Sequence, residues 1–136
     1  MIVRAAHPSH YHWLCQRAGC SPTGGFRAVE AVDSGGRILA MVGYDHWSRG
    51  SVEMHVAIDD ARAALPIRRP AFAYPFLEVG VGAVWGRVRS DNDRALRLDR
   101  ALGFKEVFRG KGWFEPGVDA VVFEMRREAC RWIRRE

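Results

Sequence analysis

The segment from Asp91 to Phe104 (DNDRALRLDRALGF) constrains the fold more than any other part of the chain. Asp91, Asn92 and Asp93 supply side-chain acceptors and negative charge for the free N–H groups of a first helical turn. Gly103 stands where a left-handed residue ends a helix, directly before a β-rich run. Between these signals the apolar residues at helical spacing are Ala95, Leu98, Ala101 and Leu102. The segment therefore predicts a surface helix that packs one apolar stripe on a sheet.

Helical and β-rich runs alternate along the chain without a linker or a repeat. The patterns predict helices over residues 8–18, 67–79 and 92–102, and strands over residues 2–6, 26–32, 37–44, 52–58, 83–88, 104–114 and 118–125. Turn signals at 33–36 (DSGG) and 115–117 (EPG) join strands into hairpins. Three successive strands imply an antiparallel meander, so we expect one α/β domain over residues 1–136.

Composition narrows the class of protein. The chain has 136 residues, enough for one domain that buries roughly two-thirds of its unfolded surface. No run approaches the roughly 20 apolar residues of a membrane span, and the N-terminus lacks the pattern of a secretory signal. We therefore expect a soluble, cytoplasmic protein without a membrane contact. Cys15, Cys20 and Cys130 are odd in number and form no CxxC pair, which favours reduced thiols over a disulfide framework.

The net charge of +5 suits a polyanionic partner, either nucleic acid or a phosphate-rich cofactor. The densest basic cluster lies near the C-terminus and is interrupted by Glu128 and Glu136. It comprises Arg126, Arg127, Arg131, Arg134 and Arg135. A solvated terminal face is the preferred interpretation of this cluster, and nucleic-acid binding is the alternative.

The pattern Asn92-x-x-Ala95-x-x-x-Asp99-x-x-Leu102-Gly103-Phe104 resembles the Asn…Leu-Gly-Phe segment near the C-terminus of the GNAT acetyltransferases. The order of elements is similar to that family from about Phe26 onward, with one N-terminal helix where many members have two. Residues 42–45 (VGYD), 53–57 (EMHVA) and 122–132 (VFEMRREACRW) look like segments of small phage-encoded members.

This resemblance implies a GNAT fold, a mixed and mostly antiparallel central sheet of about six to seven strands flanked by three helices. It also implies an N-acetyltransferase that moves an acetyl group from acetyl-CoA to a primary amine by direct attack in a ternary complex. The competing hypothesis is a catalytically inactive GNAT-fold binding module for nucleic acid or a protein partner.

Strand 52–58 carries the candidate catalytic residues. Its alternation places Glu53 and His55 on one face, with roughly 6.6 Å between their positions, so one amine or one water can touch both. His55 titrates near neutrality and can take a proton directly, whereas Glu53 can orient a water or hold the cationic amine. An ordinary polar sheet face remains an open alternative, because such alternation is expected of any half-buried antiparallel strand.

The resemblance assigns the cofactor to the same strand, where the backbone of Val56, Ala57 and Ile58 would bind pantetheine and polarise the thioester carbonyl. GNAT enzymes usually continue with a glycine-containing phosphate loop, but residues 59–69 (DDARAALPIRR) contain no glycine. With Arg62 in the leading basic position, Leu65 and Ile67 take the glycine positions and would crowd a phosphate. We expect Arg62, Arg68 and Arg69 to supply charge there instead, a solvated first turn being the alternative for Arg68 and Arg69.

Further site residues follow from the resemblance. Asn92 would bond the cofactor near pantetheine, and it can cap the helix at the same time. Asp99 stands where many members have a Tyr that donates a proton to the departing thiolate, so either Asp99 points away or another group donates. The segment after strand 37–44 would border the acceptor cleft, which makes Tyr44, His46 and Trp47 candidate substrate contacts.

A zinc site near the N-terminus is the third hypothesis. Its potential ligands are His7, His10, His12, Cys15 and Cys20. Helical geometry argues against it, because His10 and His12 point about 160° apart and Cys15 falls on the apolar stripe. No second ligand pair follows at structural-site spacing, so we expect no metal.

Overall fold

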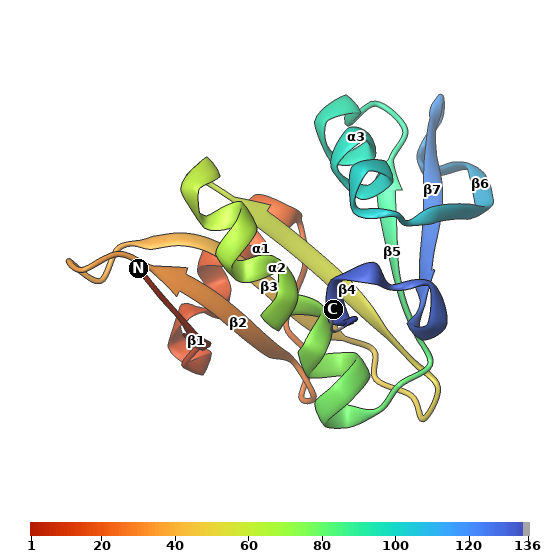
Figure 1. Ribbon diagram of the computed structural model, residues 1–136. Coiled ribbons are helices and arrows are strands. Elements are labelled where there is room, and N and C mark those ends of the chain that lie inside the picture. Colours follow the sequence, from red (N-terminus) through yellow and green to blue (C-terminus); the bar gives the residue numbers. More distant parts are fainter. Residues whose placement is uncertain (135–136) are drawn as a thin grey trace.

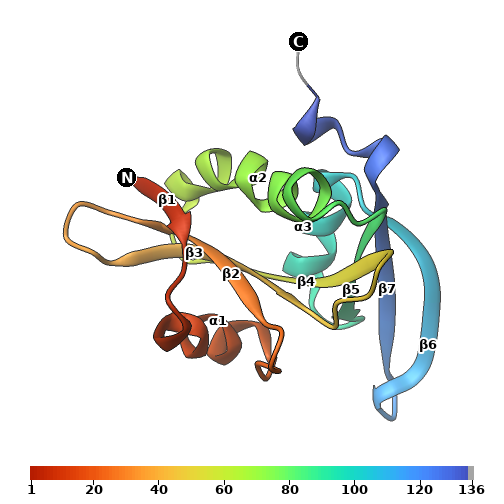
Figure 2. The same cartoon turned by 90° about the horizontal axis from the view of Figure 1, so that it is seen from below.

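The computed structural model describes residues 1–134 and contains one sheet with helices on both faces (Figures 1 and 2). The strands are β1 (Ile2–Ala5), β2 (Arg27–Val32), β3 (Ile38–Asp45), β4 (Ser51–Ile58), β5 (Ala83–Arg89), β6 (Lys105–Glu115) and β7 (Val118–Arg126). They lie in the order β1-β2-β3-β4-β5-β7-β6, and only the β4–β5 pair is parallel. The predicted mixed, mostly antiparallel sheet is confirmed.

Helices cover both faces of the sheet. They are α1 (Tyr11–Ala18), which follows a 3₁₀ turn at Pro8–His10, α2 (Ala64–Ala73) and α3 (Asp93–Leu102). Figure 2 shows α1 and α2 on opposite faces of the sheet. Among the described residues, no helix is long and apolar enough to cross a membrane. Two short 3₁₀ turns, Arg127–Ala129 and Arg131–Ile133, follow β7.

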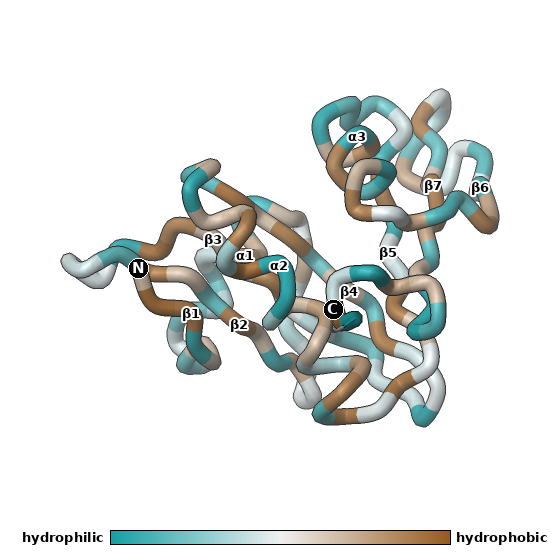
Figure 3. Tube along the Cα trace, in the orientation of Figure 1, coloured by the Kyte–Doolittle hydropathy of each residue, from teal (hydrophilic) through white to brown (hydrophobic). Residues whose placement is uncertain are grey.

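The core lies mainly between α2 and the sheet, and a smaller cluster lies beneath α1. The larger cluster includes Tyr44, Phe72, Phe76, Val84 and Phe123. The smaller cluster comprises Ala6, Leu14, Phe26, Ala28 and Met41. Hydrophilic residues colour stretches of α3 and of the segment after β7 (Figure 3). The arginine-rich end is therefore a polar surface in the described part, and Arg135 and Glu136 lie outside the described residues.

The second helix begins earlier than the predicted residue 67. A 3₁₀ turn at Ala61–Ala63 leads into α2, because the Asp60 side chain accepts a hydrogen bond from the Arg62 N–H and caps the start. After Ala73 the chain continues as a π-helix over Tyr74–Val79, which ends at Gly80 with φ of 95°. The apolar pattern alone did not reveal this start, because the capping carboxylate lies before the periodic residues.

The third helix has the predicted ends and a different buried face. Asn92 Oδ1 accepts from the Ala95 N–H at 3.1 Å, and Gly103 ends the helix with φ of 101°. The predicted stripe included Ala101, which is exposed, and omitted Leu96, which is the most buried residue of α3. This part of the prediction is wrong, because the helix is rotated so that Leu96 joins the core while Leu98 lines a hollow shared with α2.

Candidate functional site

Strands β4 and β5 pair for only a short distance. Ser51–Glu53 pairs with Ala83–Trp85, and beyond these residues the two strands diverge (Figure 1). The second half of β4 is still paired with β3 on its other side, from Met54 to Ile58. The β5-facing edge of this half is therefore open, and it leads toward α3.

Backbone contacts show which groups of β4 face the opening. A Cβ added to Gly86 would lie 3.3 Å from the Met54 carbonyl oxygen, so that carbonyl faces β5. The Ile58 carbonyl accepts from Arg94 Nη2 of α3 at 3.4 Å, so it points the same way. Backbone polar groups alternate between the two edges of a strand, so the N–H and C=O of Val56 also face the opening. The backbone of Ala57 faces β3 instead.

A cleft of about 610 Å³ occupies this opening, within the volume range of small-molecule sites. Its lining includes Val56, Ala57, Ile58, Asn92, Arg94 and Leu98. A smaller apolar hollow of about 120 Å³ continues between α2 and α3 and shares Val56, Ile58 and Leu98. The structure thus brings together Val56, Ala57, Ile58 and Asn92, the predicted cofactor residues of β4 and α3.

Glu53 forms the centre of a buried polar cluster on the α1 face of the sheet. Its side chain is almost fully buried, and its Oε1 accepts from His46 Nδ1 at 2.8 Å. Arg87 of β5 donates to the same carboxylate, from Nε to Oε2 at 3.0 Å and from Nη2 to Oε1 at 3.3 Å. This cluster gives a buried carboxylate the partners it needs.

His55 lies next to this cluster with an unused nitrogen. Its Nε2 is 3.8 Å from Glu53 Oε1, and the same nitrogen is buried without a hydrogen-bond partner. Burial is the main cause that lowers the pKa of His55 below its ordinary value of 6.5, and Glu53 opposes that shift. The imidazole is therefore neutral at pH 7 and retains a nitrogen able to accept a proton. Glu53 and His55 are side by side, as their spacing predicted.

The sheet register extends the polar face to neighbouring strands. Asp45 of β3 and Trp85 of β5 lie directly opposite Glu53, so their side chains share its face. Arg87 is two residues beyond Trp85 and occupies the same face. Sequence reasoning missed Trp85 and Arg87, although an arginine within a mostly apolar strand is itself a signal of an ion pair.

The turn after β3 brings His46 back toward Glu53. His46 has φ of 53°, a left-handed backbone that is uncommon for a residue with a side chain. Its N–H donates to Asp45 Oδ1 at 2.9 Å, and its imidazole, about half exposed, reaches Glu53. Trp47 is partly buried and donates from Nε1 to the Gly25 carbonyl at 2.8 Å.

Tyr44 does not reach the surface. It is fully buried, and its hydroxyl donates to the Ala71 carbonyl of α2. It therefore cannot contact an acceptor in this structure, which corrects its predicted place in the substrate cleft. The physical reason is strand alternation, since Tyr44 faces α2 while the next residue, Asp45, shares the opposite face with Glu53. His46 lies beyond the end of β3, where its left-handed backbone directs its side chain to Glu53.

The predicted phosphate-binding arginines have other partners. Arg62 forms an ion pair with Asp60 at 2.7 Å, on an exposed turn. The Arg68 guanidinium stacks over the Trp132 ring at 3.9 Å, and Arg69 Nη1 donates to the Trp132 carbonyl at 3.1 Å. A phosphate-binding role for these three residues stays a prediction. Arg94 is a cation that lines the cleft without an acidic partner in the described chain.

Asp99 occupies the inner side of α3, near Ala95, which lines the cleft, Leu102, which lines the apolar hollow, and the buried Leu96. Burial raises the pKa of this carboxyl from 3.8 to about 6. A carboxyl with a raised pKa binds protons more tightly in the folded chain than in the unfolded chain. The free energy of unfolding therefore falls as the pH rises from about 4 to about 6, and the loss persists above that window.

Replacing Asp99 with Asn is expected to stabilise the protein at pH 8, by on the order of 1–2 kcal/mol, because the buried charge is removed. The gain should vanish near pH 4, where Asp99 is already protonated. Denaturant unfolding of both proteins at the two pH values measures this difference. Asp93→Asn, on the exposed first turn, is the matched control and should give no gain at pH 8. A loss of stability in Asp99→Asn at pH 8 would show that contacts of the carboxylate outweigh its burial.

The N-terminal histidines form hydrogen bonds with nearby residues. His7 and His12 bond to Ser9, and His10 Nδ1 lies 2.9 Å from the buried carboxylate of Glu30. In residues 1–134 no three His, Cys, Asp or Glu side chains gather in a way that could hold a metal ion. Cys15, predicted to be in the core, is only half-buried and contacts Cys20.

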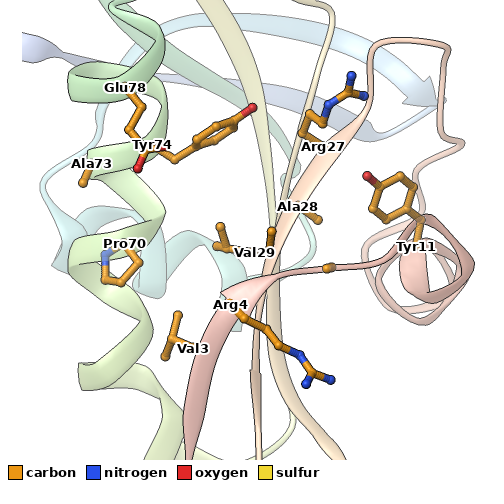
Figure 4. Close-up of a pocket in the computed structure, with 12 residues that line it drawn as sticks. Val3, Arg4, Tyr11, Arg27, Ala28, Val29, Pro70, Ala73, Tyr74 and Glu78 are labelled. Atoms are coloured by element: carbon orange, nitrogen blue, oxygen red, sulfur yellow. The ribbon is translucent and has the colours of Figure 1, made fainter.

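A second cavity, of about 320 Å³, lies on the β1 side of the sheet. Figure 4 shows Tyr74 and Glu78 of the helical segment on one side and Arg27 of β2 and Tyr11 of α1 on the other. None of the predicted site residues lines this cavity, so the cleft beside β4 is the stronger candidate site.

Known proteins resemble this chain in structure alone. No family model and no curated protein matches it. A variant of the spermidine N-acetyltransferase SpeG from Vibrio cholerae superposes with a TM-score of 0.78 at 13% identity, covering 96% of this chain and 98% of its own. A chimera of that enzyme with hSSAT gives 0.75 at 15%, covering 98% and 100%. The chain has the GNAT fold.

A protein assigned as a phosphinothricin N-acetyltransferase is another such neighbour, with a TM-score of 0.70 at 15% identity, covering 92% of this chain and 97% of its own. Coverage is nearly complete in both directions in all three comparisons. The likeness in fold thus includes the N-terminal part, where the sequence resemblance is thin.

Proposed function

We propose that this protein, as one GNAT domain over residues 1–136, is an N-acetyltransferase that moves an acetyl group from acetyl-CoA to a primary amine by direct attack in a ternary complex. The observation that carries this proposal is the open edge of β4. The free backbone groups of Val56 face a cleft, while the neutral imidazole of the preceding residue, His55, lies in the polar cluster of Glu53.

The cleft fits the cofactor in shape and in its polar groups. Its apolar extension between α2 and α3 suits an aliphatic arm, and the N–H of Val56 can donate to a thioester carbonyl. Bound acetyl-CoA would supply the activated acetyl group. Asn92 lines the cleft while it caps α3, so its two predicted roles are compatible. Arg94, which has no acidic partner among residues 1–134, offers its charge to the phosphates in place of the missing glycine loop.

The polar cluster on the other face can prepare the acceptor. A primary amine is protonated at neutral pH and must lose a proton before it can attack. His55 is neutral, so one of its two ring nitrogens carries no proton and can accept that proton. Glu53, held by Arg87 and His46, supplies the negative charge that attracts the ammonium form and stabilises the imidazolium once it forms.

The acceptor screen should include spermidine, because the SpeG neighbours are spermidine N-acetyltransferases. Release of free CoA in the presence of each amine measures turnover. A panel in which no amine increases CoA release above the rate of hydrolysis would remove the transferase assignment.

Calorimetric titration with acetyl-CoA and with free CoA tests the cofactor site directly. We expect saturable one-to-one binding, and Arg94→Ala should weaken it by about 10- to 100-fold, since a charge-assisted hydrogen bond contributes about 1.5–3 kcal/mol. Arg97→Ala is the matched control, an exposed arginine on the same helix that does not line the cleft. It should leave affinity nearly unchanged. Absence of binding at millimolar cofactor would disprove the proposed acetyltransferase function and would leave the fold assignment unchanged.

A further inference from the structure

Two cysteine side chains meet at the end of α1, outside the groups used by the proposed transfer chemistry. The Sγ atoms of Cys15 and Cys20 are 2.7 Å apart. Gly19 produces this contact, because its φ of 72° reverses the chain after α1 and its N–H donates to the Cys15 carbonyl at 2.9 Å. Cys20 is thereby folded back against the last turn of the helix.

The pair is accessible to a small reagent. Both side chains are half-buried and line a shallow surface hollow together with Tyr11, His12 and Pro22. The third cysteine, Cys130, is almost fully buried in the main core cluster and belongs to the segment after β7. The chain therefore has one adjacent and accessible thiol pair and one isolated thiol that provides an internal reference.

We propose that Cys15 and Cys20 are a reversible dithiol–disulfide site that closes on exposure to a small disulfide oxidant such as glutathione disulfide. The pairing needs no rearrangement of the fold, because the left-handed turn at Gly19 already holds the two sulfur atoms in contact. This inference does not depend on the transferase function.

The exchange proceeds in two balanced steps. The Cys15 thiolate attacks one sulfur of glutathione disulfide, which forms a mixed disulfide and releases one glutathione thiolate. Cys20 then loses its proton to solvent and attacks the Cys15 sulfur, which forms the Cys15–Cys20 bond and releases the second glutathione. Two electrons pass from the protein thiols to the oxidant. Burial raises the pKa of the Cys20 thiol, which disfavours Cys20 as the first nucleophile.

Formation of the Cys15–Cys20 disulfide would restrain the segment that follows Cys20. Thr23 donates to Asp45, and the Gly25 carbonyl accepts from Trp47, so this segment contacts the turn that carries His46. Oxidation therefore fixes the loop that borders the polar face of Glu53. We expect slower amide hydrogen exchange over residues 20–25 in the oxidised protein than in the reduced protein.

Thiol counting on the full chain tests the proposal. The protein is incubated with glutathione disulfide, and the exchange is quenched in acid. The protein is then unfolded and labelled with maleimide, and its intact mass is measured by mass spectrometry. The reduced protein should take three labels, one for each cysteine of the chain. The oxidised protein should take one label, on Cys130, and should lose the mass of two hydrogen atoms. A thiol reductant should restore all three labels.

Variants identify the partners. The Cys130→Ser variant should still form the Cys15–Cys20 disulfide and then take no label. The Cys15→Ser variant should form no disulfide and should keep the labels on its two remaining cysteines. Cys20→Ser should keep a glutathione on Cys15, because the second thiol is missing. Circular dichroism checks that each variant is folded, and the result on the natural chain does not depend on them. Three labels after oxidation, an unresolved glutathione on Cys15 in the natural chain, or a bond to Cys130 would each overturn the proposal.

Discussion

Replacing His55 with Gln is expected to lower kcat/KM for acetyl transfer by about 100- to 10,000-fold, the usual contribution of a positioned general base. The imidazole is the neutral group with an unpartnered buried nitrogen beside the Glu53 cluster. Gln keeps a polar side chain of similar size but cannot take a proton at neutral pH. Acetyl-CoA affinity, measured by calorimetry, should stay close to that of the natural chain, because the cofactor is proposed to bind the backbone of Val56.

The pH dependence distinguishes a base from a merely structural histidine. Only neutral His55 can accept the proton, so kcat/KM should fall as the pH falls through its pKa. Burial lowers that pKa below 6.5, so the acid limb of the profile should lie below pH 6.5. His55→Gln should lose this limb. The same lowered pKa makes the unfolded chain bind protons more readily than the folded chain, so stability also decreases with acid in that window.

His12→Gln is the control for His55→Gln. His12 is exposed on α1 and bonds to the carbonyl of the nearby Ser9, so its replacement should leave the rate and the pH profile unchanged. A kcat/KM of His55→Gln equal to that of the natural chain would disprove the direct role of the imidazole. In that case a water held by Glu53 would be the remaining candidate base, and Glu53→Gln would be the variant to measure next.

The sequence predicted local structure well because the signals for it are local. The caps of α3 at Asn92 and Gly103 were read directly from their side-chain and backbone chemistry. The buried face of α3 was not, because which side of a helix meets the core depends on elements far away in the chain. The early start of α2 was missed for a related reason, since Asp60 acts as its cap through one side-chain hydrogen bond.

In the candidate site, too, the local relations were predicted and the long-range contacts were not. Alternation along β4 was enough to pair Glu53 with His55, since both residues lie on one strand. Arg87 belongs to β5, and only the parallel β4–β5 register brings it to Glu53. Arg68 was assigned to a phosphate from its position near a helix start, but Trp132 of the C-terminal segment stacks on its guanidinium. Long-range contacts of this kind are not encoded in spacing.

Replacing Gly43 with Ala is expected to lower the free energy of unfolding by about 2–3 kcal/mol, toward the upper end of overpacking costs. A Cβ at Gly43 would lie 2.4 Å from Leu14 Cδ2 and 2.5 Å from Phe26 Cζ. Gly43 does not have a left-handed backbone, so crowding alone accounts for the loss. Leu14 of α1 packs directly on this glycine, which lies opposite His55 in the register. Denaturant unfolding measures the change.

Gly50→Ala is the matched control, because nothing lies within 4 Å of its added Cβ and its backbone is not left-handed. Its stability should change by less than about 0.5 kcal/mol. Leu14→Ala combined with Gly43→Ala should cost less than the sum of the two changes, because removing Leu14 Cδ2 makes room for the new methyl group. Equal stability of Gly43→Ala and Gly50→Ala would mean that α1 moves away freely. Displacement of α1 would also expose His55 and return its pKa toward 6.5. The acid limb of the rate profile should then shift to higher pH in Gly43→Ala. Such a shift would link the packing of α1 to the proposed base.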